Sequence, residues 1–262
     1  MQLEQIAAPL GARVTGLDVR SATQDQWQQV NQWFCQHKVL VFPEQQLTPD
    51  EQMAFAQRWG QLVRHPYAGM KDYPDIIELR NVGQRRDINQ HWHSDMTYEL
   101  APPKLTMLYA LSAPKLGGDT AFANQALAYR ALSSGLQQVL ANLRAEHSAA
   151  GLATQYREDA KQAPSAVHPV VRHHDETAEA ALYVCRAFTQ KFEGWSRSDS
   201  RGLLEHLFEH SVRPEFQARH RWRAGDLVMW DNRSLLHFAV HDHADDEPRL
   251  IHRLQVAGPV PT

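Results

Sequence analysis

The chain has 262 residues, of which 43% are hydrophobic and 22% are charged, as expected of a globular protein that buries a sizeable core. A formal net charge of -3 leaves no basic excess to hold a phosphate backbone, which argues against nucleic acid as a partner. The N-terminus lacks the pattern of a secretory signal, and no apolar run approaches the ~18 residues of a membrane span. We therefore expect a cytoplasmic protein whose two cysteines, Cys35 and Cys185, are free thiols.

Residues 1–60 predict strands and helices in alternation. Thr23 followed by Gln26 forms a capping box, in which each side chain bonds the backbone N–H of the other residue at a helix start. Thr48 and Pro49 give a second start, because proline at the first helical position loses no hydrogen bond. The expected elements are a strand over Ala12–Val19, a helix from Thr23 to about His37, a buried strand over Val39–Phe42 and a helix from Thr48 to Gly60.

From about Asp75 onward, the chain consists largely of short apolar runs separated by Gly, Pro and Asp. Such runs are typical of strands, and we expect them at Ile76–Leu79, His91–Asp95, Leu105–Ala110, His168–Arg172, Ala181–Val184, Leu227–Trp230, Leu236–Val240 and Arg249–Val256. Helices are expected at Gln125–Arg144, with a break near Ser133, and at Ser198–Ser211. The pattern predicts a mixed α/β, β-rich fold with a jelly-roll or barrel sheet, buttressed by helices, in a single domain over residues 1–262.

The segment 89–95 carries a candidate metal-binding pattern. In an extended chain, alternate side chains share a face, so that His93 and Asp95 would point the same way, together with His91. An imidazole and a carboxylate on one face can chelate one metal ion, and His237, in a C-terminal strand pattern, offers a third ligand. Two histidines and one carboxylate form the facial triad of non-haem Fe(II) oxygenases, which leaves open positions for other ligands.

The last predicted strand places Arg249 and Arg253 on one face, with Ile251 between them. The apolar neighbours on both faces indicate that the strand is covered, and a buried guanidinium needs an anion. At a rise of about 3.3 Å per residue the two arginines stand about 13 Å apart, so one small anion would not serve both. We expect the two arginines to bind a dicarboxylate and a second anion; a structural salt bridge from Arg253 to a carboxylate such as Asp231 or Asp242 is the alternative.

Several motifs, in family order over nearly the whole chain, resemble the taurine dioxygenase / 2,4-dichlorophenoxyacetate dioxygenase (TauD/TfdA) family. They are Gly11–Asp18, Trp92–Tyr98, Ala101–Pro103, Gly117–Phe122, His168–Val171, Ala181–Val184, Trp230–Arg233 and Ile251–Arg253. One departure is Cys185, which stands where family members usually carry Asn after the Tyr-Val pair. Others fall after His65 and over 81–88, next to where the family binds substrate, and they put taurine itself in doubt.

The resemblance implies a double-stranded β-helix and an Fe(II)- and 2-oxoglutarate-dependent dioxygenase that consumes O2 and releases succinate and CO2. It assigns the iron to His93, Asp95 and His237, the co-substrate 2-oxoglutarate to Thr120 and Arg249, and the substrate to His65, Asn89 and Arg253. No side chain beyond the metal centre is expected to be catalytic. The substrate would be a small anion such as a sulfonate, sulfate ester, aryloxyalkanoate or amino acid, with no nucleic acid or membrane partner, and the assembly a homo-oligomer, dimer or tetramer.

Two other interpretations stay open at this point. His91 and His93 followed by Glu99 resemble the ligand pattern of cupin-type metalloenzymes that do not use 2-oxoglutarate, although Glu99 lies farther along than that pattern allows. A catalytically inactive jelly-roll binding module is the non-enzyme alternative. A helical pair, His206 and His210, lacks the Glu that a zinc protease needs directly after its first histidine.

Overall fold

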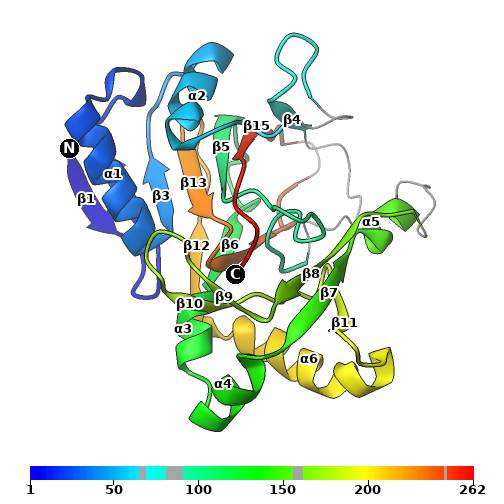
Figure 1. Ribbon diagram of the computed structural model, residues 1–262. Helices are drawn as coiled ribbons and strands as arrows, with labels where there is room; N and C mark the ends of the chain where they lie inside the picture. The colour runs from blue at the N-terminus through cyan, green and yellow to red at the C-terminus, as the bar shows by residue number, and fades with distance from the viewer. Residues whose placement is uncertain (65–68, 81–90, 156–161, 245–246) are drawn as a thin grey trace.

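The computed structural model describes residues 1–64, 69–80, 91–155, 162–244 and 247–262 (Figure 1). The strands are β1 (Gln2–Gln5), β2 (Ala12–Thr15), β3 (Val39–Phe42), β4 (Ile77–Arg80), β5 (Leu105–Ser112), β6 (Thr120–Asn124), β7 (Arg144–Ser148), β8 (Ser165–Pro169), β9 (Val171–His173), β10 (Ala180–Leu182), β11 (Thr189–Phe192), β12 (Gln217–His220), β13 (Leu227–Asp231), β14 (Leu235–Ala239) and β15 (Leu250–Val256). The helices are α1 (Gln24–His37), α2 (Pro49–Ala56), α3 (Gln125–Arg130), α4 (Ser134–Leu140), α5 (Ala150–Gln155) and α6 (Arg197–Ser211), with short 3-10 turns η1 (Val19–Ser21), η2 (Gln57–Trp59) and η4 (Pro214–Phe216).

Two sheets form the centre of the molecule. The larger has the strand order β1-β2-β3-β13-β5-β15-β4, and the smaller has the order β12-β6-β14. Neighbouring strands run antiparallel in both sheets, except that β2 and β3 are parallel. Apolar side chains of the large sheet, including Leu108, Trp230 and Ile251, share a buried cluster with Phe122 and Leu235 of the small sheet. The predicted mixed α/β, strand-rich fold is confirmed.

The outer face of the large sheet is covered by α1 and α2 (Figure 1). Val30 and Phe34 of α1 and Phe55 of α2 are buried in one cluster with Leu105 and Met107 of β5, together with other side chains of the sheet. Both helices begin at the predicted caps, Thr23 and Thr48, and both caps form capping boxes. The second helix ends at Ala56, and η2 continues the coil to Gly60, whose φ of +139° suits glycine best.

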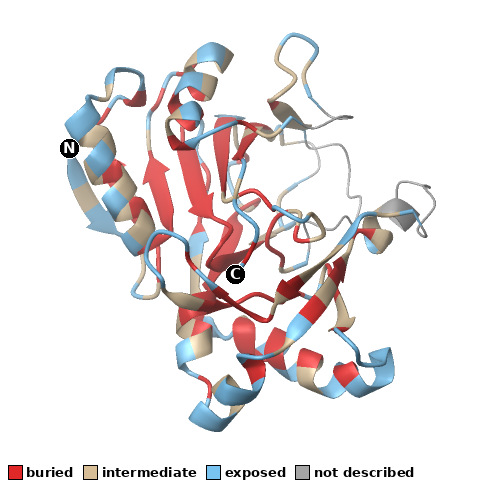
Figure 2. Ribbon diagram, viewed as in Figure 1, coloured by how far each residue is buried: buried red, intermediate tan, exposed pale blue. Residues whose placement is uncertain are grey.

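A second core lies at the end of the molecule where α3, α4 and α6 gather (Figures 1 and 2). Buried side chains from these helices, among them Leu140 and Leu207, pack with Phe192 of β11 and neighbouring strands. Where one broken helix over 125–144 was predicted, the structure has two. The break falls as expected, because the Ser133 side chain caps α4 by accepting from the Leu136 N–H, but the chain is extended again from Arg144.

One predicted strand is wrong, and five were missed. Within 91–95 only His93 pairs, in an isolated bridge with His237, and from Asp95 onward the chain turns, with a φ of +49° at Met96. The segment therefore joins the sheet at one point of contact and forms no ladder. The missed strands carry polar or small residues that hide the alternation on which such predictions depend: β1, β6, β7, β11 and β12.

A buried ion cluster fixes the turn between β13 and β14, which connects the two sheets. The Asp231 carboxylate accepts from Arg233 Nε (2.8 Å) and Nη2 (2.7 Å), and lies 2.8 Å from His174 Nε2. Arg233 Nη1 also reaches Asp175 and Glu176. Burial alone would raise the pKa of the Asp231 carboxyl, but Arg233 and His174 hold it well below the usual range. The cluster thereby sets the start of β14.

Replacing Arg233 by Met should destabilise the protein by on the order of 3–5 kcal/mol, because Asp231 would keep a buried charge without its main partner. The matched control is Arg13→Met, which breaks an exposed pair with Glu4 at 3.7 Å and should cost no more than roughly 1 kcal/mol. Urea unfolding of both variants measures the difference. Equal, small losses would mean that the ion cluster contributes nothing beyond a surface pair.

Candidate metal centre

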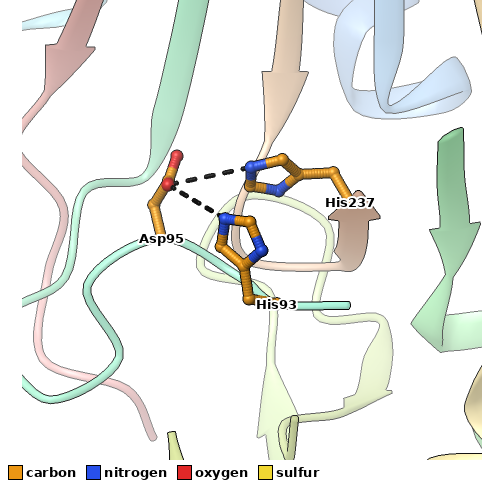
Figure 3. Close-up of side chains that lie close together, drawn as sticks. All are labelled: His93, Asp95 and His237. Carbon is orange, nitrogen blue, oxygen red and sulfur yellow. Dashed lines mark ion pairs between the residues drawn. The ribbon is translucent and has the colours of Figure 1, made fainter. Parts of the chain in front are cut away.

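His93, Asp95 and His237 converge between the two sheets, although His237 is distant in the sequence from the other two (Figure 3). His237 lies on β14 of the small sheet, and His93 lies opposite it. The His93 N–H donates to the His237 carbonyl at 3.0 Å, and the His237 N–H donates to the His93 carbonyl at 2.8 Å. In an antiparallel pair such residues are directly opposite, so their side chains share a face. This explains the ring centroid separation of 4.1 Å.

The potential ligand atoms face one another across a small space. The Asp95 Oδ1 atom lies 3.8 Å from His93 Nε2 and 3.7 Å from His237 Nε2. One ligand atom from each of the three residues can be chosen so that all lie within 4.8 Å of one another. All three residues are buried. Among the described residues, this is the one group of His, Cys, Asp and Glu side chains with such geometry.

The protonation of the group suits a divalent transition metal. His93 Nδ1 lies 2.7 Å from the His91 carbonyl, so that this nitrogen carries the hydrogen and Nε2 is left as the acceptor. Burial, and then the neighbouring His93, hold the pKa of His237 well below its usual value. Burial alone would raise the pKa of Asp95, but Arg253, the two histidines and Thr106 hold it below the usual range. A neutral imidazole at His237 and an ionised carboxylate at Asp95 fit Fe(II).

Arg253 contacts the candidate metal ligand directly. Its Nη2 donates to Asp95 Oδ1 at 2.7 Å, and its side chain keeps 19% of its surface exposed. The alternative partners weighed from the sequence are wrong, because Asp231 bonds Arg233 and His174, and Asp242 bonds Arg219 at 2.8 Å. One guanidinium nitrogen of Arg253 therefore contacts the candidate ligand Asp95, and part of the Arg253 side chain is accessible to solvent.

Thr120 and Arg249 come from different sheets. Thr120 is the first residue of β6; it pairs with Ala239, as Phe122 pairs with His237, so that Thr120 and His237 project from the same face. The Thr120 hydroxyl accepts from Trp222 Nε1 at 3.0 Å. Arg249 is half-buried and directly precedes β15, where the register with β5 shifts between Leu250 and Ile251.

His65 and Asn89 lie outside the described residues. His91 is exposed and Glu99 is not part of the ligand group, which removes the geometric support for a cupin-like site. Cys35 and Cys185 are free thiols, as expected.

Two buried residues that contact the site have no role in the assignment made from the sequence. Thr106 Oγ1 donates to Asp95 Oδ2 at 2.6 Å, and the Asn232 side chain donates to that hydroxyl at 2.9 Å. A signal for Thr106 was present, since it is a lone hydroxyl on the inward face of the apolar strand 105–110, where a buried polar group needs a partner. Asn232 carried no such signal, because it lies in a turn whose contacts depend on the fold.

Replacing His237 by Ala should abolish tight Mn(II) binding, because one of three ligands is lost and the other two are too few to compete with water. Mn(II) serves as a redox-stable probe, measured by titration calorimetry. His91→Ala is the control, since His91 is exposed and contacts the site through its backbone. The assignment fails if His237→Ala binds Mn(II) as the unmodified chain does, or if His91→Ala alone loses it.

Comparison with known proteins agrees with this geometry. A family model described as "Taurine catabolism dioxygenase TauD, TfdA family" matches residues 2–255. An alkylsulfatase of Acinetobacter baylyi is 35% identical over all of this chain and 86% of its own. The 2,4-dichlorophenoxyacetate dioxygenase of Cupriavidus pinatubonensis is 36% identical over 88% of this chain and 91% of its own, and a sulfate ester dioxygenase of Pseudomonas putida is 33% identical over 100% and 91%. The latter two are named as alpha-ketoglutarate-dependent enzymes.

Solved structures share the fold over the whole chain. The crystal structure of a putative alpha-ketoglutarate-dependent taurine dioxygenase from Burkholderia xenovorans superposes with a TM-score of 0.90 at 31% identity, and covers 100% of this chain and 94% of that one. The structure of AAD-2, in complex with Mn(II) and N-oxalylglycine, superposes with a TM-score of 0.86 at 30% identity, over 100% and 98%. These likenesses confirm the expected jelly-roll fold.

Proposed function

Because the chain belongs to the TauD/TfdA family and is an Fe(II)- and 2-oxoglutarate-dependent dioxygenase, we propose that its iron is held by His93, Asp95 and His237. The observation that carries this proposal is the convergence of two Nε2 atoms on one carboxylate oxygen at 3.7 and 3.8 Å. When bound, iron and 2-oxoglutarate supply the oxidising chemistry that couples decarboxylation of the co-substrate to hydroxylation of a substrate C–H bond. No general base is required. The residues of the protein bind and orient the substrate and exclude water.

Arg249 and Thr120 are proposed to hold the carboxylate of 2-oxoglutarate that lies far from the iron. A guanidinium grips a carboxylate through two parallel hydrogen bonds, and a neighbouring hydroxyl can add a third. The strand register supports this assignment, because Thr120 and His237 project from one face of the small sheet. Trp222 donates to the Thr120 oxygen, which leaves the Thr120 hydroxyl hydrogen available for an acceptor.

The substrate is proposed to be a small organic anion whose negative group binds Arg253. This guanidinium lies beside the proposed iron ligand Asp95 and keeps part of its surface accessible, so an anion held there would have its carbon skeleton next to the metal. The names of the relatives support an anionic substrate, since sulfate esters and 2,4-dichlorophenoxyacetate are both small anions. His65 and Asn89 are proposed to complete the pocket. Precise placement of one C–H bond is then the protein's contribution to rate.

The partners are proposed to be small molecules and further copies of this chain, as a dimer or tetramer. The charge of -3 supports the absence of a nucleic acid partner. None of the described helices is both long enough and apolar enough to cross a membrane. Size-exclusion chromatography with light scattering tests the assembly state.

Replacing Arg249 by Leu should raise the apparent 2-oxoglutarate constant strongly, because losing a buried charged contact costs on the order of 2–5 kcal/mol. The measurement is the anaerobic titration of the Fe(II)-loaded protein with 2-oxoglutarate, followed by the visible charge-transfer band. Arg80→Leu is the control, because Arg80 is exposed and pairs with Glu78. An unchanged constant in Arg249→Leu would place the carboxylate elsewhere.

Replacing Arg253 by Ala should raise the substrate KM, with little change in the 2-oxoglutarate constant, when assayed at saturating Fe(II). Saturation matters because Arg253 also contacts Asp95. Succinate formation with sulfate esters, sulfonates and aryloxyalkanoates identifies the substrate class. If the best substrate is neutral or cationic, or if both constants change in parallel, the anion-binding role is refuted.

A further inference from the structure

The Thr106 hydroxyl lies at the centre of a buried hydrogen-bond network behind Asp95. Its oxygen is 2.6 Å from Asp95 Oδ2, 2.9 Å from Asn232 Nδ2 and 3.3 Å from Gln255 Nε2. The Asn232 Oδ1 atom in turn accepts from Trp230 Nε1 at 3.0 Å. Thr106 has no exposed surface, and Asn232 keeps 1%. Water therefore does not compete for these groups.

The register of the large sheet brings the network together. Thr106 on β5 is paired with Trp230 on β13 and with Gln255 on β15. Directly opposite residues on adjacent strands place their side chains on the same face, so the three side chains stand in one row across the sheet. Asp95 approaches that row from the adjoining loop, which is fastened by the Ser94 hydroxyl donating to the Asn232 carbonyl at 2.7 Å.

The direction of each hydrogen bond follows from the chemistry of its end groups. The indole N–H of Trp230 can only donate, so the Asn232 amide must present its oxygen to Trp230 and its NH2 group to Thr106. With that donor, and the Gln255 amide as a second, the lone pairs of the Thr106 oxygen are filled. Its single hydrogen is therefore directed at Asp95 Oδ2, which as part of an ionised carboxylate can only accept.

We propose that Thr106 and Asn232 are positioning residues that decide which oxygen of Asp95 is offered to the metal. Oδ2 is occupied by a hydroxyl donor whose orientation is fixed, while Oδ1 lies on the side of the two imidazole Nε2 atoms, where it also accepts a hydrogen bond from Arg253 Nη2 at 2.7 Å. Thr106, oriented by Asn232, thus selects one-oxygen coordination and holds the carboxylate in place before the metal arrives, so that less order has to be created on binding. This inference rests on the proposed iron ligands.

The test compares variants at the same row of the sheet by Mn(II) titration calorimetry without 2-oxoglutarate. Thr106→Val keeps the shape and removes the hydroxyl, and it should weaken Mn(II) binding about 10-fold to 100-fold, as losses of groups that orient a ligand do. Thr106→Ser keeps the hydroxyl and should bind nearly as the unmodified chain does. Gln255→Met removes the other donor to Thr106 without freeing the hydroxyl hydrogen, and it should leave the affinity nearly unchanged.

Two further readouts separate positioning from general stability. The visible spectrum of the Co(II)-loaded protein reports coordination, and it should change in Thr106→Val but not in Gln255→Met. Urea unfolding of the metal-free variants identifies any that do not fold, and Thr106→Ala then replaces Thr106→Val as the variant without the hydroxyl.

The outcomes distinguish this inference from the ligand assignment. If a folded variant lacking the Thr106 hydroxyl binds Mn(II) and shows a Co(II) spectrum like those of the unmodified chain, while His237→Ala binds none, the positioning role is overturned and the iron assignment stands. If His237→Ala binds Mn(II) normally, the ligand assignment itself has failed.

Discussion

The structure depends on keeping the Asp95 carboxylate ionised inside the protein. Removing a charge from water is costly, and an unpaired carboxylate at this depth would take up a proton instead. Three kinds of group prevent this: the Arg253 guanidinium, the hydroxyl of Thr106 and the nearby histidines. Arg253, Thr106 and His237 come from β15, β5 and β14, so that the ionisation of one residue requires both sheets to be in register.

The arrangement around Asp95 shows how each sheet contributes. The large sheet presents Thr106 and Arg253 from neighbouring strands, while the small sheet presents His237 and, through one isolated bridge, fixes His93. The two sheets are linked by the turn between β13 and β14, which the Asp231–Arg233 cluster holds rigid. A small shift of this turn would move His237 relative to Asp95, so a cluster without any ligand atom still controls the geometry of the site.

Much of the fold was predictable because its signals are local. The helix starts at Thr23 and Thr48 follow from side chains within three residues, and β3 follows from an uninterrupted apolar run at 39–42. The segment 91–95 was predicted as a strand, but a ladder needs a partner strand, and within the part of the chain that the structure describes only His237 pairs with it. His93, Asp95 and His237 were found from residue type and family resemblance together. The contact of Arg253 with Asp95 and the bonds of Asn232 arise from side chains that meet only after the sheets have packed, so no local pattern could indicate them.

The placement of the three proposed ligands on different parts of the fold also has a mechanical consequence. His93 and Asp95 belong to a loop held against the large sheet through Ser94 and Thr106, whereas His237 belongs to the small sheet. An ion bound to all three side chains would act as a cross-link between the two halves of the sandwich and close a chain loop of well over a hundred residues. Its binding free energy would be added to the resistance of the sandwich against opening. Backbone amides of β14 would then exchange their hydrogens with solvent more slowly when the metal is present. The iron would stabilise the fold as well as take part in catalysis.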